Sequence, residues 1–229
     1  MSKKIFIPTA SADDWKSFLA EPERQWRTGF SARTLAHCWE SADGFPPEVV
    51  SVFSHSEIAA FRNLELLIAF PEYKVYLPPM SGHPSQNDLF VLAKDGDKNL
   101  VTIAIEGKVS ESFDKTISEW KPSETKGKTI RFEFLQDLFG LKEIPTSIRY
   151  QLLHRSASAI LEAQKFNAKS AVMLVHSFSP EMLWLDDFQA FAGLFEVHAE
   201  PERLYFIKDI NDVHFYVAWV KGNERFLEE

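Results

Sequence analysis

The sequence predicts an α/β (α+β) protein with a mixed sheet, in the order helix, strand, strand, strand, helix, strand. Two observations support this fold class. The turn-forming sequence KDGDKN joins two apolar segments, as expected of a β-hairpin. A long amphipathic helix over 148–166 then precedes the continuous apolar segment AVMLVHSF, so a crossover connection can add a fourth strand to the same sheet.

The composition suits one domain with an extension at each end. The chain has 229 residues, and 45% of them are hydrophobic, which is enough to build a substantial core. We expect a single domain over 1–229, with a core over about 54–178. A helical N-terminal extension over 1–50 and a C-terminal extension over 179–229 would flank that core.

Cysteine usage and hydropathy predict a cytoplasmic protein. Cys38 is the only cysteine, so no internal disulfide can form, which suits a reducing compartment. The apolar patch near the N-terminus is too short for a signal peptide, and no apolar run is long enough to span a membrane. The net charge of −8 disfavours binding of a polyanion over the whole surface.

The first half of the chain predicts helices before the sheet. Residues 4–8 suit a short strand, and 11–40 suit two or three short helical elements. Gly44 and two prolines in SADGFPPE end any helix there. A helix is then expected over 54–70, stopping before Pro71. Four apolar residues share one face of it: Ile58, Phe61, Leu64 and Ile68.

Three strands and a second set of helices should follow. The strands are expected over 74–77, over 88–93 and from 99 onward, with short helices near Ile117 and over 134–138. The helix over 148–166 should end at Asn167, a suitable C-terminal cap. The remaining predictions are a strand over 171–178, a helix from 179–181 and a terminal hairpin formed by 204–210 and 213–220.

Three charged residues should converge at one end of the sheet. Alternation along the third strand places Glu106 and Lys108 on the same face. Asp88 opens the second strand, and hairpin pairing brings that position towards the end of the third. Two carboxylates and an ammonium suit a divalent cation, because hard cations such as Mg²⁺ prefer carboxylate and carbonyl oxygens. The carbonyl of Gly107, which has no side chain to obstruct it, could add another oxygen.

This arrangement resembles the PD-(D/E)xK (restriction-endonuclease-like) nuclease superfamily over roughly residues 54–178. That superfamily has an acid at the start of its second core strand and Glu-x-Lys on the third; here the sequences are SQND and EGK. Asn87 stands where the motif has proline. The resemblance implies a restriction-endonuclease-like core and Mg²⁺ or Mn²⁺ held by Asp88 and Glu106. Lys108 would orient water or stabilise the transition state, supported by Gln151.

Two further positions leave alternatives open. The superfamily often adds an acid from the first core helix, and we favour Glu65 as this third metal ligand over Glu57, which fits a capping box with Ser54. Some members also carry Gln-x-x-x-Tyr on the later helix, whereas this chain has Gln151 followed by Arg155. The alternative for that pair is a solvated helix stripe, with Arg155 interacting weakly with Gln151 or Glu162.

Other segments give weaker signals. The most basic segment is expected to be a flexible loop that either contacts nucleic-acid phosphates or is simply solvated. Its cations are Lys121, Lys126, Lys128 and Arg131. His176 is expected to be a hydrogen-bonded structural residue, and His37 and Cys38 to be packing residues. No P-loop, dinucleotide fingerprint or zinc-spaced cysteine pair occurs in the sequence.

The sequence therefore supports three hypotheses for function. The first is a metal-dependent nuclease that cleaves a phosphodiester. The second is a non-catalytic binding or scaffold protein that retains the fold, with a protein partner or a second copy contacting its aromatic-rich terminal hairpin. The third is an enzyme that uses the same acids on a small phosphorylated molecule.

Overall fold

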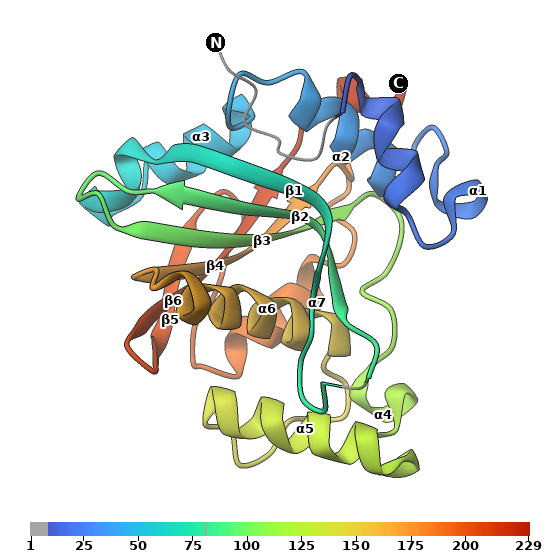
Figure 1. Ribbon diagram of the computed structural model, residues 1–229, viewed down its shortest axis with the longest axis vertical. Coiled ribbons are helices and arrows are strands. Elements are labelled where there is room, and N and C mark those ends of the chain that lie inside the picture. Colours follow the sequence, from blue (N-terminus) through green and yellow to red (C-terminus); the bar gives the residue numbers. More distant parts are fainter. Residues whose placement is uncertain (1–8, 81) are drawn as a thin grey trace.

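A computed structural model describes residues 9–80 and 82–229, and its six strands form one mixed sheet in the order β1-β2-β3-β4-β6-β5 (Figure 1). The strands are β1 (Glu65–Val75), β2 (Ser85–Lys94), β3 (Leu100–Lys108), β4 (Ser170–Ser177), β5 (Leu204–Ile210) and β6 (Val213–Lys221). The predicted α/β class with a mixed sheet is confirmed. The strand predicted over 4–8 lies outside the described residues.

Helices precede, connect and follow these strands. The α-helices are α1 (Pro22–Gln25), α2 (Ser31–Glu40), α3 (Pro47–Ser54), α4 (Ile117–Trp120), α5 (Lys126–Phe139), α6 (Tyr150–Phe166) and α7 (Leu185–Gly193). Four 3-10 helices, η1 (Ala12–Phe18), η2 (Ala59–Asn63), η3 (Pro122–Glu124) and η4 (Glu224–Leu227), complete the set. No helix in the described part of the chain is long and apolar enough to cross a bilayer.

The connections explain why the sheet is mixed. β1, β2 and β3, which are consecutive in the chain, form an antiparallel meander. α6 then crosses over and returns the chain to β4, which runs parallel to β3. β6 continues the sheet parallel to β4, and β5 pairs with β6 as the predicted hairpin. The hairpin strand β6 therefore lies inside the sheet rather than at its edge.

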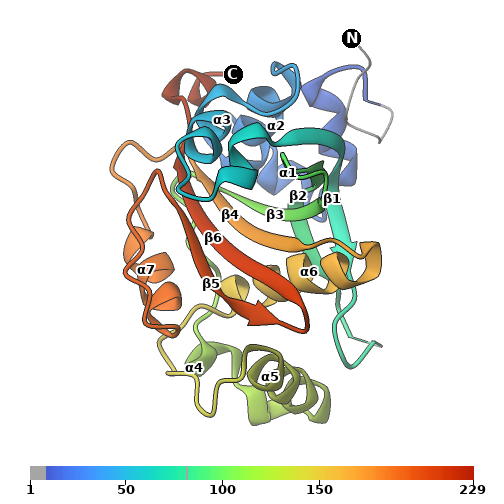
Figure 2. The same ribbon diagram turned by 90° about the vertical axis from the view of Figure 1, so that its left-hand side faces the viewer.

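The sheet separates two apolar layers (Figure 2). Side chains alternate along β3, so Ile103 and Ile105 pack with α2 and α3, whereas Ala104 packs with α6. By the same alternation, Glu106 and Lys108 face the α6 layer. This alternation brings the two charged residues of β3 onto the side of the sheet that α6 covers.

The predicted helix over 54–70 is wrong. α3 ends at Ser54, and the residues from Glu65 onward form β1, which pairs with β2 along most of its length. Apolar residues at 58, 61, 64 and 68 fit helical spacing, but ELLIAF is also a continuous apolar run of strand length. Periodicity alone cannot distinguish these readings, and the pairing with β2 decides the outcome.

Candidate active site

The three predicted residues meet where β2 begins and β3 ends. The antiparallel ladder between these strands stops at Leu89 and Ile105, so Asp88 lies opposite Glu106 in the next register position. There the Asp88 side chain takes the place of a backbone acceptor: the Gly107 backbone N–H donates to Asp88 Oδ2 at 2.8 Å. A Cβ on Gly107 would lie 3.4 Å from that same oxygen, an ordinary contact, and 3.3 Å from Leu35 Cδ2, a tighter one.

Glu106 accepts hydrogen bonds on both carboxylate oxygens. Lys108 Nζ and Gln151 Nε2 each donate to Oε1 at 2.7 Å, and Arg155 Nε donates to Oε2 at 2.6 Å. Glu106 is only 2% exposed, so its charge depends on these partners. Gln151 and Arg155 are four residues apart on α6 and so share the helix face directed at β3.

Lys108 is buried beside the carboxylate. Its ammonium also donates to Gln151 Oε1 at 3.3 Å and lies 4.9 Å from the centre of the Phe113 ring. Gln151 therefore accepts from Lys108 with one end of its amide and donates to Glu106 with the other. This double contact fixes the positions of both charged groups.

The solvated stripe considered for Arg155 is wrong. Arg155 is buried; besides Glu106, it contacts Ser85 Oγ through Nη1 at 3.1 Å and Asp88 Oδ1 through Nη2 at 3.9 Å. Glu162 instead accepts from Tyr73 and Lys165 on a different part of α6. Arg155 is thus the second cation of the site, shared by Asp88 and Glu106.

A third acid comes from β1, at a position that the sequence analysis did not identify. Glu72 lies in the same cavity as Asp88 and Glu106, and Gln86 Nε2 donates to its Oε2 at 2.7 Å. Its backbone φ is +52°, a left-handed conformation that non-glycine residues rarely adopt and that recurs at functional sites. Glu72 lies between the helix predicted over 54–70 and the strand predicted over 74–77, so the sequence analysis placed it in neither element. We call Glu72, Asp88, Glu106, Lys108, Gln151 and Arg155 the acidic site.

Glu65, the predicted third metal ligand, does not reach the acidic site. It begins β1, opposite Lys94, and forms an ion pair with that residue at 2.6 Å. Lys94 and Asp88 lie six residues apart on β2, or about 20 Å at the rise of a strand. The alternative, Glu57, is exposed in a bend after α3 and forms no capping box. Glu72, at the other end of β1 from Glu65, is the acid that joins the cluster.

The pKa values of the acids separate into two groups. Burial and the charge of Glu106 raise the pKa of Asp88 to about 7, and burial and the charge of Asp88 raise that of Glu72 to about 8. Burial also acts to raise the pKa of Glu106, but the charges of Arg155 and Lys108 outweigh it and hold that pKa below its ordinary value. Two cations therefore neutralise one acid well and leave the other two prone to protonation.

The acidic site opens into a cavity of about 590 Å³ between the sheet end and the N-terminal segment. Residues of that segment, among them Arg24 and Ser31, line the opposite wall. Glu111 and Asp114, just beyond β3, add two more acids to the lining. Glu111 accepts from the Ser31 N–H at 2.8 Å, which ties the N-terminal segment to the site. The cavity is rich in carboxylates and has room for a hydrated cation and a ligand.

The basic segment is not the predicted flexible loop. Thr125 caps α5 by accepting from the Lys128 N–H at 3.2 Å, so the chain is helical from Lys126 onward. Arg131 is buried and donates to backbone carbonyls of the loop between β1 and β2. Lys128 pairs with Glu124, while Lys121 and Lys126 are exposed. Arg131 therefore supports a loop and is not open to a phosphate.

A separate cluster, formed by Cys38, Glu48 and His176, has potential metal-ligand atoms within 4.8 Å of one another. Trp39 Nε1, which can only donate, contacts His176 Nδ1 at 3.1 Å, so the neutral ring carries its proton on Nε2, the atom 3.6 Å from Glu48 Oε1. A metal on Nε2 would require that proton to leave. Burial also raises the pKa of the Cys38 thiol far above its usual range. His176 is thus hydrogen-bonded and Cys38 is buried, which is the environment expected of a structural histidine and a packing cysteine.

Comparison with known families gives one match. A family model described as "Domain of unknown function (DUF6946)" matches residues 8–224, which is nearly the whole chain. No curated protein and no solved structure matches the sequence. The acidic site is therefore the feature of the chain that bears on its function.

Proposed function

We propose a function for this chain from the geometry of the acidic site. The chain belongs to the family described as Domain of unknown function (DUF6946), and that description names no activity. The proposed function is hydrolysis of a phosphodiester with the help of a divalent cation, as in the PD-(D/E)xK nucleases that the sequence resembles. One observation carries the proposal: Asp88, Glu106 and Lys108 converge at one sheet end, where Glu72 supplies a further carboxylate.

The donor atoms suit Mg²⁺ or Mn²⁺. In the described part of the chain, neither Asp88 Oδ1 nor Glu72 Oε1 accepts a hydrogen bond, and Glu106 Oε2 accepts only from Arg155. These three oxygens retain lone pairs for a hard cation. Burial, and after it the charge of a neighbouring acid, raises the pKa values of Asp88 and Glu72, and a bound cation would stabilise both carboxylates in their charged form. When bound, such an ion lowers the pKa of a water molecule and offsets phosphoryl charge.

The remaining groups of the site have distinct roles in this proposal. Lys108 provides an ammonium beside Glu106 that can orient water or offset charge on the reacting phosphate. Gln151 positions both Lys108 and Glu106 through its amide. Arg155 holds Glu106 in its ionised form and aligns it.

Glu106 provides the first test. Replacing it with glutamine removes the charge but keeps the shape, so we expect Mg²⁺- or Mn²⁺-dependent cleavage of labelled oligonucleotides to fall at least about a hundredfold. Glu65→Gln is the matched control, because it removes an equivalent charge at the far end of the sheet. Thermal unfolding would check that both variants fold. A Glu106→Gln protein that cleaves as fast as the native chain would overturn the proposal.

A non-catalytic binding protein is the second candidate. Its supporting observation is that Lys108, Gln151 and Arg155 already satisfy Glu106, as they would in a purely structural network. Mn²⁺ binding separates the two candidates and can be followed by electron paramagnetic resonance. The proposed enzyme binds Mn²⁺ and loses it in Asp88→Asn, whereas a structural network binds none.

An enzyme acting on a small phosphorylated molecule is the third candidate. The observation that favours it is the size of the cavity, about 590 Å³, which suits a small ligand. Hydrolysis of a small chromogenic phosphodiester, with no cleavage of oligonucleotides, would support this candidate over a nuclease. Both activities would depend on Glu106.

A further inference from the structure

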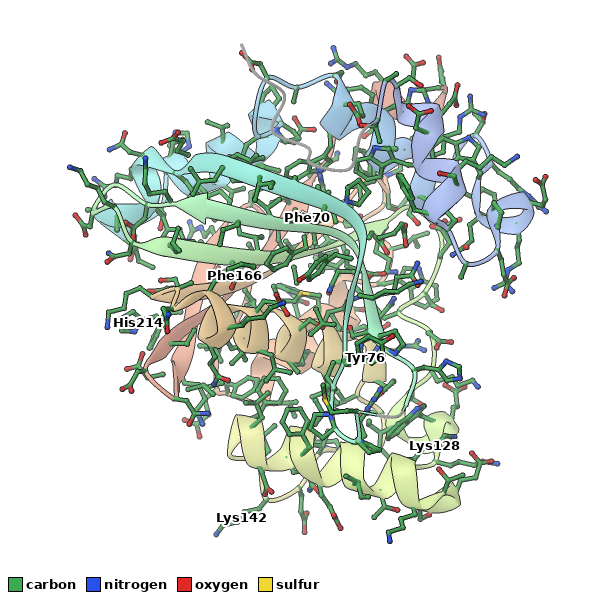
Figure 3. All side chains as sticks on the ribbon, in the orientation of Figure 1. Phe70, Tyr76, Lys128, Lys142, Phe166 and His214 are labelled. Carbon is green, nitrogen blue, oxygen red and sulfur yellow. The ribbon has the colours of Figure 1, made fainter. Side chains whose placement is uncertain are left out.

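A second cavity lies beside the acidic site. It has a volume of about 330 Å³ and is lined by the loop between β1 and β2, by the end of α4 and by the starts of α5 and α6. Figure 1 shows the long β1–β2 hairpin extending past α6 towards α5, and Figure 3 shows Lys128 on α5 and Tyr76 on the hairpin above it. We call it the aromatic cavity, and the lining that matters here is Pro79, Ser85, Trp120, Gly127, Tyr150 and His154.

The two cavities are separated by a thin wall. On α6, Tyr150 and His154 line the aromatic cavity, while the residues that follow each of them, Gln151 and Arg155, line the cavity of the acidic site. Ser85 connects the two sides, because its Oγ accepts from Arg155 Nη1 at 3.1 Å and lies 2.8 Å from His154 Nδ1. The two cavities therefore lie on either side of the first turns of α6, next to each other.

The lining of the aromatic cavity offers aromatic rings and two cations, Lys128 and Arg131, to a flat ligand. Trp120 and Tyr150 stack with their ring centres 3.9 Å apart and their planes within 11° of parallel, and His154 lies 4.7 Å from Tyr150. Burial and the charge of Arg155 lower the pKa of His154, so its imidazole is neutral. His154 Nε2 makes no hydrogen bond within the described chain, which leaves one polar atom for a ligand.

The cavity is also held open before any ligand binds. Arg131 donates to the carbonyls of Leu77, Pro78 and His83, at 2.9, 3.0 and 2.7 Å. These three bonds attach the hairpin loop to α5 and fix the wall that contains Pro79. A preformed cavity binds a ring with little ordering cost.

We propose that the aromatic cavity binds an unpaired nucleobase of a strand whose phosphodiester lies in the acidic site. Stacking on aromatic side chains beside a phosphate-handling groove is how single strands are bound without sequence preference. A base within a duplex is paired and stacked and cannot enter such a cavity. The substrate would therefore be single-stranded at this point. This inference rests on the proposed function.

Filling the cavity tests the inference. A Cβ on Gly127 would lie 3.7 Å from Pro79 Cγ, an ordinary contact, so a larger side chain there occupies the cavity without removing a hydrogen bond. We expect Gly127→Leu to weaken binding of a labelled single-stranded oligonucleotide of about twelve nucleotides by about tenfold, measured by fluorescence anisotropy in EDTA. Gly127→Ala, the matched control, should bind like the native chain. Native affinity in the Gly127→Leu variant would overturn the inference.

Two further measurements decide the matter if Gly127→Leu does not fold. Adenosine and thymidine carry no phosphate, so their competition with the oligonucleotide reports base binding directly; no competition by either would overturn the inference. The same oligonucleotide as a duplex should bind at least about tenfold more weakly than the single strand. Equal affinity for both forms would also overturn it.

The binding assay separates this inference from the proposed function. Because it uses EDTA, the assay reports binding without cleavage, and Glu65→Gln, at the far end of the sheet, should bind the single strand like the native chain. Binding that depends on Gly127 without cleavage under any divalent cation would support the cavity and reject the nuclease. Cleavage that Gly127→Leu leaves unchanged, with unchanged binding, would support the nuclease and reject the cavity.

Discussion

At the scale of single residues, the stability of the site depends on how the buried charge of Glu106 is compensated. Two cations and one amide surround this carboxylate, and all of them come from β3 or α6. Taking such charges out of water costs several kcal/mol per ion, which only close pairing can offset. Removing one partner therefore costs more than the pair itself contributes, because the other charge remains buried.

The first prediction concerns Arg155. We expect Arg155→Met to lower the free energy of unfolding by about 3–5 kcal/mol, because Glu106 would lose the partner of its Oε2. Urea unfolding measures the change. Arg203→Met is the control: Arg203 is exposed and only 4.0 Å from Glu200, so its loss should cost about 0–1 kcal/mol. Equal costs for the two variants would contradict the compensation argument.

The second prediction concerns pH. In the unfolded chain Asp88 and Glu72 have ordinary pKa values of 3.8 and 4.5, and folding raises them to about 7 and about 8. Over the pH range between the ordinary and the raised pKa values, the folded protein therefore binds more protons than the unfolded chain. The stability that the protonated acids provide is complete below pH 3.8 and is lost as the pH rises through 7 and 8.

Mg²⁺ competes with those protons, so its stabilising effect should grow with pH. At about one hundred times its Kd, Mg²⁺ should raise Tm by roughly 5–10 °C near pH 8.5, and by less near pH 6. Thermal unfolding with and without Mg²⁺ measures both shifts. Asp88→Asn should abolish them. A shift that does not change with pH would mean that the cation binds elsewhere.

At the scale of secondary-structure elements, the sequence predicts that Asp88, Glu106 and Lys108 meet, but it does not predict β1, the strand that adds Glu72. Strand alternation and the KDGDKN turn are local signals, and together they brought Asp88 to Glu106 and Lys108. Residues from Glu65 onward have no such local signal, because a short apolar run fits a helix or a strand equally well. Long-range pairing with β2 decides between the two, and a single sequence does not contain it.

The same limit explains why two residues of the site were missed or misjudged. Glu72 joins the cluster only because β1 is a strand that runs alongside β2 as far as Ser85. Arg155 looked like a member of a polar helix stripe, since helical spacing does not say which side of α6 the sheet covers. Both roles follow from packing between distant segments, whereas the roles of Asp88 and Glu106 follow from neighbouring strands.

The third prediction follows from the direction of β1. Glu72 lies at the end of the strand near the acidic site, and Glu65 lies at the other end. We expect Glu72→Gln to weaken Mn²⁺ binding by about tenfold or more, whether it contacts the ion or orients its neighbours. Glu65→Gln should leave the affinity unchanged. Isothermal titration of both variants with Mn²⁺ provides the comparison, and the opposite order of effects would restore Glu65 as the third acid.

At the scale of the whole molecule, the C-terminal hairpin is part of the central structure. β6 pairs with β4 along its whole length, and its side chains enter both apolar layers. Phe215 packs in the layer that also contains α6, with its ring 6.1 Å from that of Phe139. A core over 54–178 would leave one side of β4 unpaired and expose this apolar surface. We therefore expect the sheet to unfold as one unit.

The last prediction tests that unit. Phe215 is fully buried, so Phe215→Ala should lower the free energy of unfolding by about 3–5 kcal/mol. Phe206→Ala, on the neighbouring strand β5, is the matched control, because Phe206 is 45% exposed and its loss should cost far less. Urea unfolding followed by tryptophan fluorescence and by circular dichroism should give one coincident transition, with the same denaturant dependence in both variants. Two separate transitions, with Phe215→Ala shifting only one of them, would mean that the hairpin folds apart from the rest of the sheet.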